Sequence, residues 1–174
     1  PQLWAWGRRR MGVLRRLVKR VFAILPFEER FFQEAGVPCT FVGHPLLDEV
    51  PVKHDSHQDR KSLNVASGAL VLGLLPGSRQ AEIREILPAM LESLKLIAPR
   101  VTTLSILLAQ AQNVPDSVIH EILAKSDFPV RVIKGRPNEV MAASDCLLIA
   151  SGTATLQAAL IGTPMVILYR VSVL

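Results

Sequence analysis

The sequence has few cysteines and lacks the pattern of a metal site. Cys39 and Cys146 are the only cysteines among 174 residues, and they lie far apart in apolar surroundings. Two such residues provide neither a disulfide framework nor a zinc-binding pattern. His54, Asp55 and His57 lie close together, but no closing group of ligands appears nearby. We therefore predict no metal, and a reducing, cytoplasmic compartment fits the cysteine content.

Acidic residues are absent from the start of the chain. No Asp or Glu precedes Glu28, whereas seven of the 20 Lys and Arg residues lie between Arg8 and Arg20. This local excess favours one anionic partner at this segment over a nucleic-acid surface along the whole chain. Apolar residues at helical spacing predict a basic amphipathic helix over Arg8–Phe22. Such a helix can lie on an anionic membrane or pack on a sheet with its basic face in solvent, and the two interpretations are compatible.

Two further signatures are missing. The chain contains neither a G-x-G-x-x-G fingerprint nor a Walker loop, so NAD and ATP chemistry are not indicated and no cofactor is predicted. The uncharged run from Cys146 to Tyr169 is long enough to span a bilayer, but it contains Gly152, Gly162 and Pro164. We interpret this run as the buried centre of a parallel sheet.

The remaining sequence alternates between apolar strands and amphipathic helices. From residue 69 onwards this alternation predicts an α/β fold with a doubly wound, Rossmann-like parallel sheet. The expected strands are 70–75, 104–108, 130–133, 146–150 and 165–168, and the expected helices are 81–97, 116–125, 139–143 with Asn138 as N-cap, and one that ends at Gly162.

The first fifty residues are typical of the end of another α/β domain. Residues 1–6 are expected to end a strand, 21–25 and 40–42 to form strands, and 27–35 to form a helix. The polar stretch 51–68 has little periodicity and is expected to be a linker. The predicted organisation is therefore a first domain over 1–50, a linker over 51–68 and a second, incomplete domain over 69–174.

Two loops carry the candidate site. Strand-to-helix loops of a parallel sheet emerge at one edge, so the loops at 76–79 and 151–155 are expected to meet there. Small residues, hydroxyls, helix amides and one guanidinium could hold a diphosphate at this edge, although Ser or Thr as an ordinary N-cap explains the second loop equally well. Glu82 could steer Arg79, but a solvated first-turn Glu is the simpler interpretation. The candidate substrate-binding residues are Gly77, Ser78, Arg79, Ser151, Gly152, Thr153, Ala154, Thr155 and Gln157.

Seven short motifs, in this order along nearly the whole chain, resemble the lipid-A-disaccharide synthase family. They begin at Trp4, Leu25, Val42, Leu75, Met141, Ser151 and Gly162, and they read WAW, LPFE, VGHP, LPGSR, MAASD, SGTATL and GTPM. The Gly–Thr loop alone would be shared with other two-domain glycosyltransferases, whereas the combination is specific.

The resemblance implies an inverting, metal-independent glycosyltransferase of the GT-B type. It would transfer 2,3-diacylglucosamine from UDP to 2,3-diacylglucosamine 1-phosphate and so form the lipid A disaccharide precursor. Residues 1–50 would end the acceptor-side domain, and residues 69–174 would form most of the UDP-sugar domain. Arg79 would be catalytic by stabilising the departing UDP. Both substrates would be acylated lipids. The basic segment Arg8–Arg20 would therefore contact the cytoplasmic face of the inner membrane.

The chain departs from the family pattern in two ways. Gln157 stands where the family usually has a Glu that is expected to hold the ribose hydroxyls. The half of the family protein that contains the general base is absent, so we expect these 174 residues to be a fragment that is inactive alone. Two alternatives remain open: an enzyme similar to UDP-N-acetylglucosamine 2-epimerase, and a non-catalytic module that binds UDP-sugars or membranes. The oligomeric state is left open.

Overall fold

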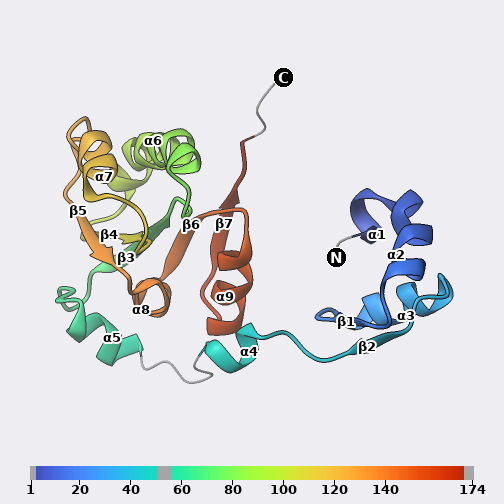
Figure 1. Cartoon of the computed structure of the whole chain (residues 1–174). Helices are drawn as coiled ribbons and strands as arrows, with labels where there is room; N and C mark the ends of the chain where they lie inside the picture. Colours follow the sequence, from blue (N-terminus) through green and yellow to red (C-terminus); the bar gives the residue numbers. More distant parts are fainter. Residues whose placement is uncertain (1–2, 51–55, 171–174) are drawn as a thin grey trace. The chain divides into compact units, whose positions relative to one another are not determined.

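The computed structural model describes residues 3–50 and 56–170 and divides the chain into two compact units (Figure 1). Unit 1 comprises residues 1–49, and unit 2 comprises residues 50–174. Each unit has its own hydrophobic core.

Unit 1 is built on a short parallel pair of strands. Its elements are α1 (Leu3–Trp6), η1 (Arg8–Arg10), α2 (Met11–Leu17), β1 (Val21–Ala23), α3 (Pro26–Glu34), β2 (Cys39–Phe41) and α4 (Leu46–Glu49). The core of unit 1 centres on Phe32 of α3, whose side chain is fully buried. Pro26 begins α3, where a missing amide hydrogen has no consequence, and Gly36 adopts the left-handed conformation that ends it.

The start of unit 1 corrects two predictions. The segment expected to end a strand contains helix α1, with Pro1 and Gln2 outside the described residues. The amphipathic helix expected over Arg8–Phe22 is a 3₁₀ turn followed by α2, which ends at Leu17. Extended backbone at Val18 stops α2 early, because the chain turns there to enter β1.

Unit 2 has a five-stranded parallel sheet in the order β5-β4-β3-β6-β7. Its strands are β3 (Leu70–Leu75), β4 (Leu104–Gln110), β5 (Val130–Lys134), β6 (Cys146–Ala150) and β7 (Met165–Leu168). Within this sheet the chain first forms β3 and then adds β4 and β5 on one side of it. It then crosses to the other side of β3 to form β6 and β7. This confirms the predicted doubly wound sheet, and the pattern reverses direction between β3 and β6.

Helices cover both faces of this sheet (Figure 1). The helices are α5 (Ser56–Ser62), α6 (Gln80–Ile97), α7 (Asp116–Leu123), α8 (Pro137–Ala143) and α9 (Thr153–Ile161), with a 3₁₀ turn η2 (Ala98–Arg100) after α6. Alternate residues of β3 point to opposite faces. Leu72 and Leu74 pack with α6 and α7, whereas Val71 and Leu75 pack with α8, α9 and Leu63 after α5. The central strands β3, β4 and β6 are therefore largely buried, as their continuous apolar runs predict. β7 was also expected in the buried centre, but it is an edge strand in which Val166 and Ile167 are each 54% exposed.

Part of the expected linker is a helix. α5 lies between residues 51 and 68 and packs on α8, and both belong to unit 2. Arg60 donates to the carbonyl of Ala143 at 2.9 Å and pairs with Asp145 at 2.7 Å. These contacts hold a polar helix that has no buried residue of its own.

The uncharged run over 146–169 and helix α8 both bear on predictions made from the sequence. The uncharged run over 146–169 forms β6, α9 and β7, and none of the helices in the described ranges is long and apolar enough to cross a bilayer. The prediction of Asn138 as N-cap is wrong, because α8 starts two residues earlier than expected, at Pro137, with Arg136 as its N-cap. The proline is pre-organised for this first helical position.

The Asp145 carboxylate joins the start of β6 to β3 and is expected to contribute measurably to stability. One oxygen accepts the amide of Val71 at 2.8 Å, and the other pairs with Arg60. Asp145→Ala leaves the buried Val71 without this partner and should lower the free energy of unfolding by about 1–3 kcal/mol in urea denaturation. Glu92→Ala, which removes only the exposed pair with Lys95, is the control and should cost at most about 1 kcal/mol. Equal losses in the two variants would contradict the structural role of Asp145.

Candidate functional site

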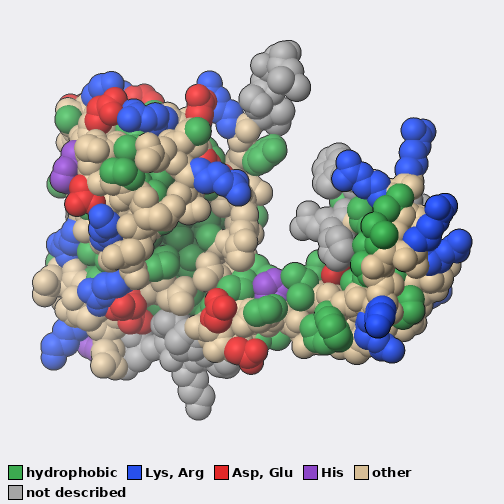
Figure 2. Space-filling view, viewed as in Figure 1, with side chains coloured by type: hydrophobic (Ala, Val, Ile, Leu, Met, Phe, Trp, Pro, Cys, Tyr) green, Lys and Arg blue, Asp and Glu red, His purple; other side chains and the backbone are tan. Residues whose placement is uncertain are grey.

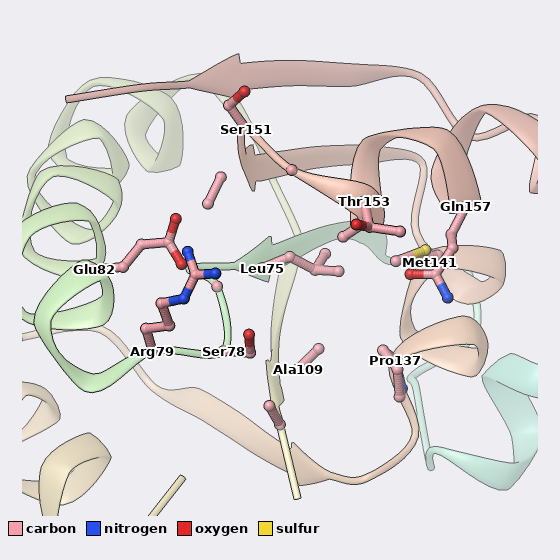
Figure 3. A pocket seen from close by; sticks show the side chains of 15 residues that line it. Leu75, Ser78, Arg79, Glu82, Ala109, Pro137, Met141, Ser151, Thr153 and Gln157 are labelled. Carbon is pink, nitrogen blue, oxygen red and sulfur yellow. The ribbon is translucent and has the colours of Figure 1, made fainter. Parts of the chain in front are cut away.

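The two loops expected to meet do lie together. β3 and β6 are neighbours in parallel register, with Leu75 opposite Ile149, so the loop after each strand begins at the same level of the sheet. Both loops line one pocket of ≈ 340 Å³ (Figure 3). This volume is in the range of sites for small molecules. Of the nine candidate residues, all except Thr155 line the pocket.

The loop between β6 and α9 presents backbone to the pocket. Gly152 is the N-cap of α9, and a side chain at this position would meet nothing within 4 Å. The first amides of a helix have no partner inside the helix, so those of Thr153 and Ala154 are available to an anion. Thr155 is used differently, since its hydroxyl donates to the carbonyl of Gly152 at 2.7 Å. Thr155 therefore helps to shape the loop and does not line the pocket.

The loop between β3 and α6 supplies the charged groups. Arg79 is the N-cap of α6 and is exposed, and its guanidinium has no ion pair or side-chain hydrogen bond within the described ranges. Gly77 has φ +109°, and its Cα lies directly against the carboxylate of Glu82. Glu82 therefore folds back over the loop, but no ion pair joins it to Arg79 in the described structure. The steering role considered for Glu82 has no support in this geometry.

A third loop, which the sequence did not single out, supports the first. Asn113, in the connection between β4 and α7, donates from its side-chain amide to the carbonyl of Ser78 at 3.2 Å. The same connection contributes Ala111 to the pocket. The rule that loops gather at the carboxyl edge of the sheet applies to β4 as well, so this loop could have been included from the sequence.

The pocket is chemically asymmetric. Arg79 and Glu82 lie at one end in Figure 3, and Pro137, Met141 and Gln157 lie at the other. Pro137 and Met141 belong to α8, which was predicted only as a helix over 139–143 and not as part of the site. Nearby Asn138 has a buried side-chain oxygen without a hydrogen-bond partner among the described residues. The end with Arg79 and Glu82 suits charged or hydroxyl groups of a ligand, and the other end suits a flat, largely apolar ring.

Gly77 should be required for the shape of this pocket. Gly77→Ala places a Cβ 2.2 Å from a Glu82 oxygen and also imposes a left-handed backbone on a residue with a side chain. We expect a loss of about 1–3 kcal/mol in the free energy of unfolding, measured by urea denaturation.

Gly152→Ala is the matched control for this variant. Its φ of 165° is extended, and the new methyl group would enter open space. Its stability should change by less than about 0.5 kcal/mol. A Gly77→Ala protein as stable as the Gly152→Ala protein would show that Glu82 and the loop rearrange freely.

Comparison with solved structures identifies the fold. Over 92% of this chain and 47% of the other, the structure is similar to HepE of Anabaena in complex with UDP and glucose, with a TM-score of 0.54 and 18% identity. It is also similar to the wall teichoic acid polymerase TagF, over 91% of this chain and 41% of that chain, with a TM-score of 0.53 and 15% identity. At this identity the likeness establishes the fold alone, which is the predicted α/β fold of GT-B glycosyltransferases.

Comparison of sequences identifies the family. Lipid-A-disaccharide synthases of Syntrophus aciditrophicus, Geobacter sulfurreducens and Myxococcus xanthus are 38%, 41% and 40% identical over 99–100% of this chain. The chain spans slightly less than half of their lengths, at 45–46%. The family model described as lipid-A-disaccharide synthetase matches residues 1–174. This chain therefore belongs to the lipid-A-disaccharide synthetase family.

Proposed function

We propose that unit 2 binds the UDP group of a UDP-sugar donor and that the whole protein transfers the sugar to an acylated acceptor. The reaction proposed is transfer of 2,3-diacylglucosamine from UDP to 2,3-diacylglucosamine 1-phosphate. The observation that carries this proposal is the meeting of the loops after β3 and β6 in one pocket. Family membership favours this transferase over the 2-epimerase-like alternative. Activity on soluble UDP-N-acetylglucosamine alone would favour the epimerase.

The asymmetry of the pocket gives the donor a direction. The uracil would lie against Pro137, close to the fully buried Met141, with the ribose near Gln157. The diphosphate would then lie between the amides of Thr153 and Ala154 and the guanidinium of Arg79. Negative charge builds up on the diphosphate as the glycosidic bond breaks, so preorganised donors here lower the barrier most effectively. Arg79 is accordingly the residue to which we assign the catalytic role in this chain.

The rest of the protein completes the proposal. Residues 1–50 would end the acceptor-side domain, and residues 69–174 would form most of the donor domain. The general base would come from the part of the family protein that this chain does not match. We expect the 174-residue chain to bind UDP without forming disaccharide, and formation of disaccharide by this chain alone would contradict the assignment of the base.

UDP binding should depend on Arg79 and respond to Gln157. Arg79→Ala removes charge-assisted hydrogen bonds to the diphosphate and should weaken UDP binding about 10- to 100-fold in isothermal titration calorimetry. Arg84→Ala is the control, since Arg84 pairs with Glu121 on the surface and does not line the pocket.

Gln157→Glu converts a neutral hydrogen bond to the ribose into a charged one and should strengthen UDP binding about 2- to 30-fold in the same titration.

The UDP titrations test the two assignments separately. UDP affinity unchanged by Arg79→Ala would refute the diphosphate subsite. UDP affinity unchanged by Gln157→Glu would refute only the ribose assignment.

The surface of unit 1 supports a peripheral membrane role, which we propose lies on the cytoplasmic face. Arg15 and Arg16 of α2 are exposed, and Val13 and Leu17 of the same helix are 57% and 78% exposed. Figure 2 shows basic and hydrophobic side chains next to one another on this unit. Met11 and Leu14 pack against the core of unit 1, so α2 both supports the fold and presents a basic, partly apolar face. Acylated substrates lie in the membrane, which makes such a face useful.

Charge reversal should separate membrane binding from folding. We expect the chain to co-sediment with vesicles that contain phosphatidylglycerol and not with pure phosphatidylcholine vesicles. Arg15→Glu, Arg16→Glu and Lys19→Glu together should weaken this binding on the order of 100-fold, because each basic residue contributes about 1 kcal/mol. A control with the same change in net charge reverses Lys61, Lys95 and Lys125. Equal losses in the two triple variants would refute a specific membrane face at α2.

A further inference from the structure

Glu82 is an acid in a pocket suited to an anion. It is the only acidic residue that lines the pocket in the described structure, and its side chain is half-buried. Its carboxylate lies over the Cα of Gly77, where a Cβ would approach one oxygen to 2.2 Å. Neither a hydrogen bond nor an ion pair of this carboxylate is present among the described residues, Arg79 included. A negative group here repels a diphosphate, so its presence in the pocket needs a separate explanation.

The stability of α6 does not account for this placement. An acid in the first turn favours a helix through the dipole, but an outward-pointing side chain would give the same benefit. Glu85, on the next turn of α6, points to the surface and pairs with Arg170 at 2.9 Å. Glu82 instead points into the pocket and requires glycine at position 77 to do so. This inward position is the kind of local conflict that marks functional sites.

The position of Glu82 matches one part of the donor. Base, ribose, diphosphate and sugar follow one another along a UDP-sugar. With the base against Pro137 and close to Met141, the sugar falls at the opposite end, where Figure 3 shows Glu82 beside Arg79. A carboxylate only accepts hydrogen bonds, and it does so strongly, so it suits the hydroxyl groups of a sugar ring. In the proposed donor, acylation at positions 2 and 3 leaves only the 4- and 6-hydroxyls free.

We propose that Glu82 accepts hydrogen bonds from a free hydroxyl of the donor sugar and so determines specificity for the sugar. This inference rests on the proposed function, because it needs a UDP-sugar in this pocket with the stated direction. Glu82 would disfavour free UDP, whose terminal phosphate brings additional negative charge to this end. It would favour UDP-sugar, because hydrogen bonds from the sugar hydroxyls to the carboxylate offset that repulsion. Glu82 would therefore help to discriminate the donor from the product UDP.

The test compares UDP with UDP-N-acetylglucosamine, which has free hydroxyls at positions 3, 4 and 6. Calorimetric titrations of the 174-residue chain give the ratio of the two affinities for the wild type, Glu82→Gln and Glu82→Ala. We expect Glu82→Gln to bind UDP more tightly than the wild type and to lose about tenfold in the preference for UDP-N-acetylglucosamine over UDP. Glu82→Ala should lose at least as much of this preference. Glu85→Gln, on the same helix but outside the pocket, should leave the ratio unchanged.

The outcomes separate this inference from the proposed function. A wild-type chain that binds neither ligand contradicts the proposed function itself. A wild-type chain that binds both, with a ratio that Glu82→Gln does not change, overturns the role of Glu82 alone. Equal weakening of both ligands in Glu82→Gln and Glu82→Ala also overturns it, since that result indicates a general effect on the loop. An altered ratio with tighter UDP binding supports it.

Discussion

The parallel pairing of β3 with β6 is the constraint on which the site depends. The two strands are separated by 70 residues in sequence, yet Leu72 lies opposite Cys146 and Leu75 opposite Ile149. A doubly wound sheet reverses direction at this pair, which leaves a crevice that no crossover helix covers. Both loops open into the crevice from the same level. A slip of one residue would exchange the side chains that face the two helix layers and would move Gly73 away from Ser144 and Leu147, so this close fit helps to fix the register.

Small and polar residues at the base of β6 adapt the two strands to each other. Gly73 is needed at the centre of β3, because a Cβ there would lie 2.5 Å from atoms of Ser144 and Leu147. The Ser144 hydroxyl donates to the carbonyl of Val140, which joins α8 to this junction. Asp145 accepts the amide of Val71 next to it. The same short segment therefore positions α8, with Met141 in the pocket, and the strand that leads into the Gly–Thr loop.

The sequence predicts the parts of this structure that depend on burial. β3 and β6 have the expected bounds, because continuous apolar runs in a parallel sheet have few alternative structures. The helix α5 was missed because Ser56–Ser62 has no apolar periodicity, and side-chain contacts from Arg60 and Arg136 to distant residues hold it. The inward position of Glu82 could not be predicted either. It follows from the left-handed backbone of Gly77, which the spacing of residues does not specify.

The charges of the pocket give its backbone a part in the proposed binding of a diphosphate. Arg79 and Glu82 are the charged residues lining it in the described structure, and their formal charges cancel. In the proposed complex, attraction for the diphosphate would come from the peptide groups at the start of α9 as well as from Arg79. Gly152 leaves open space beside the first amides of α9, whereas Gly77 is covered by the carboxylate of Glu82. In the proposed reaction, Arg79 would share the diphosphate with these amides and would stabilise the charge that develops on it as the glycosidic bond breaks.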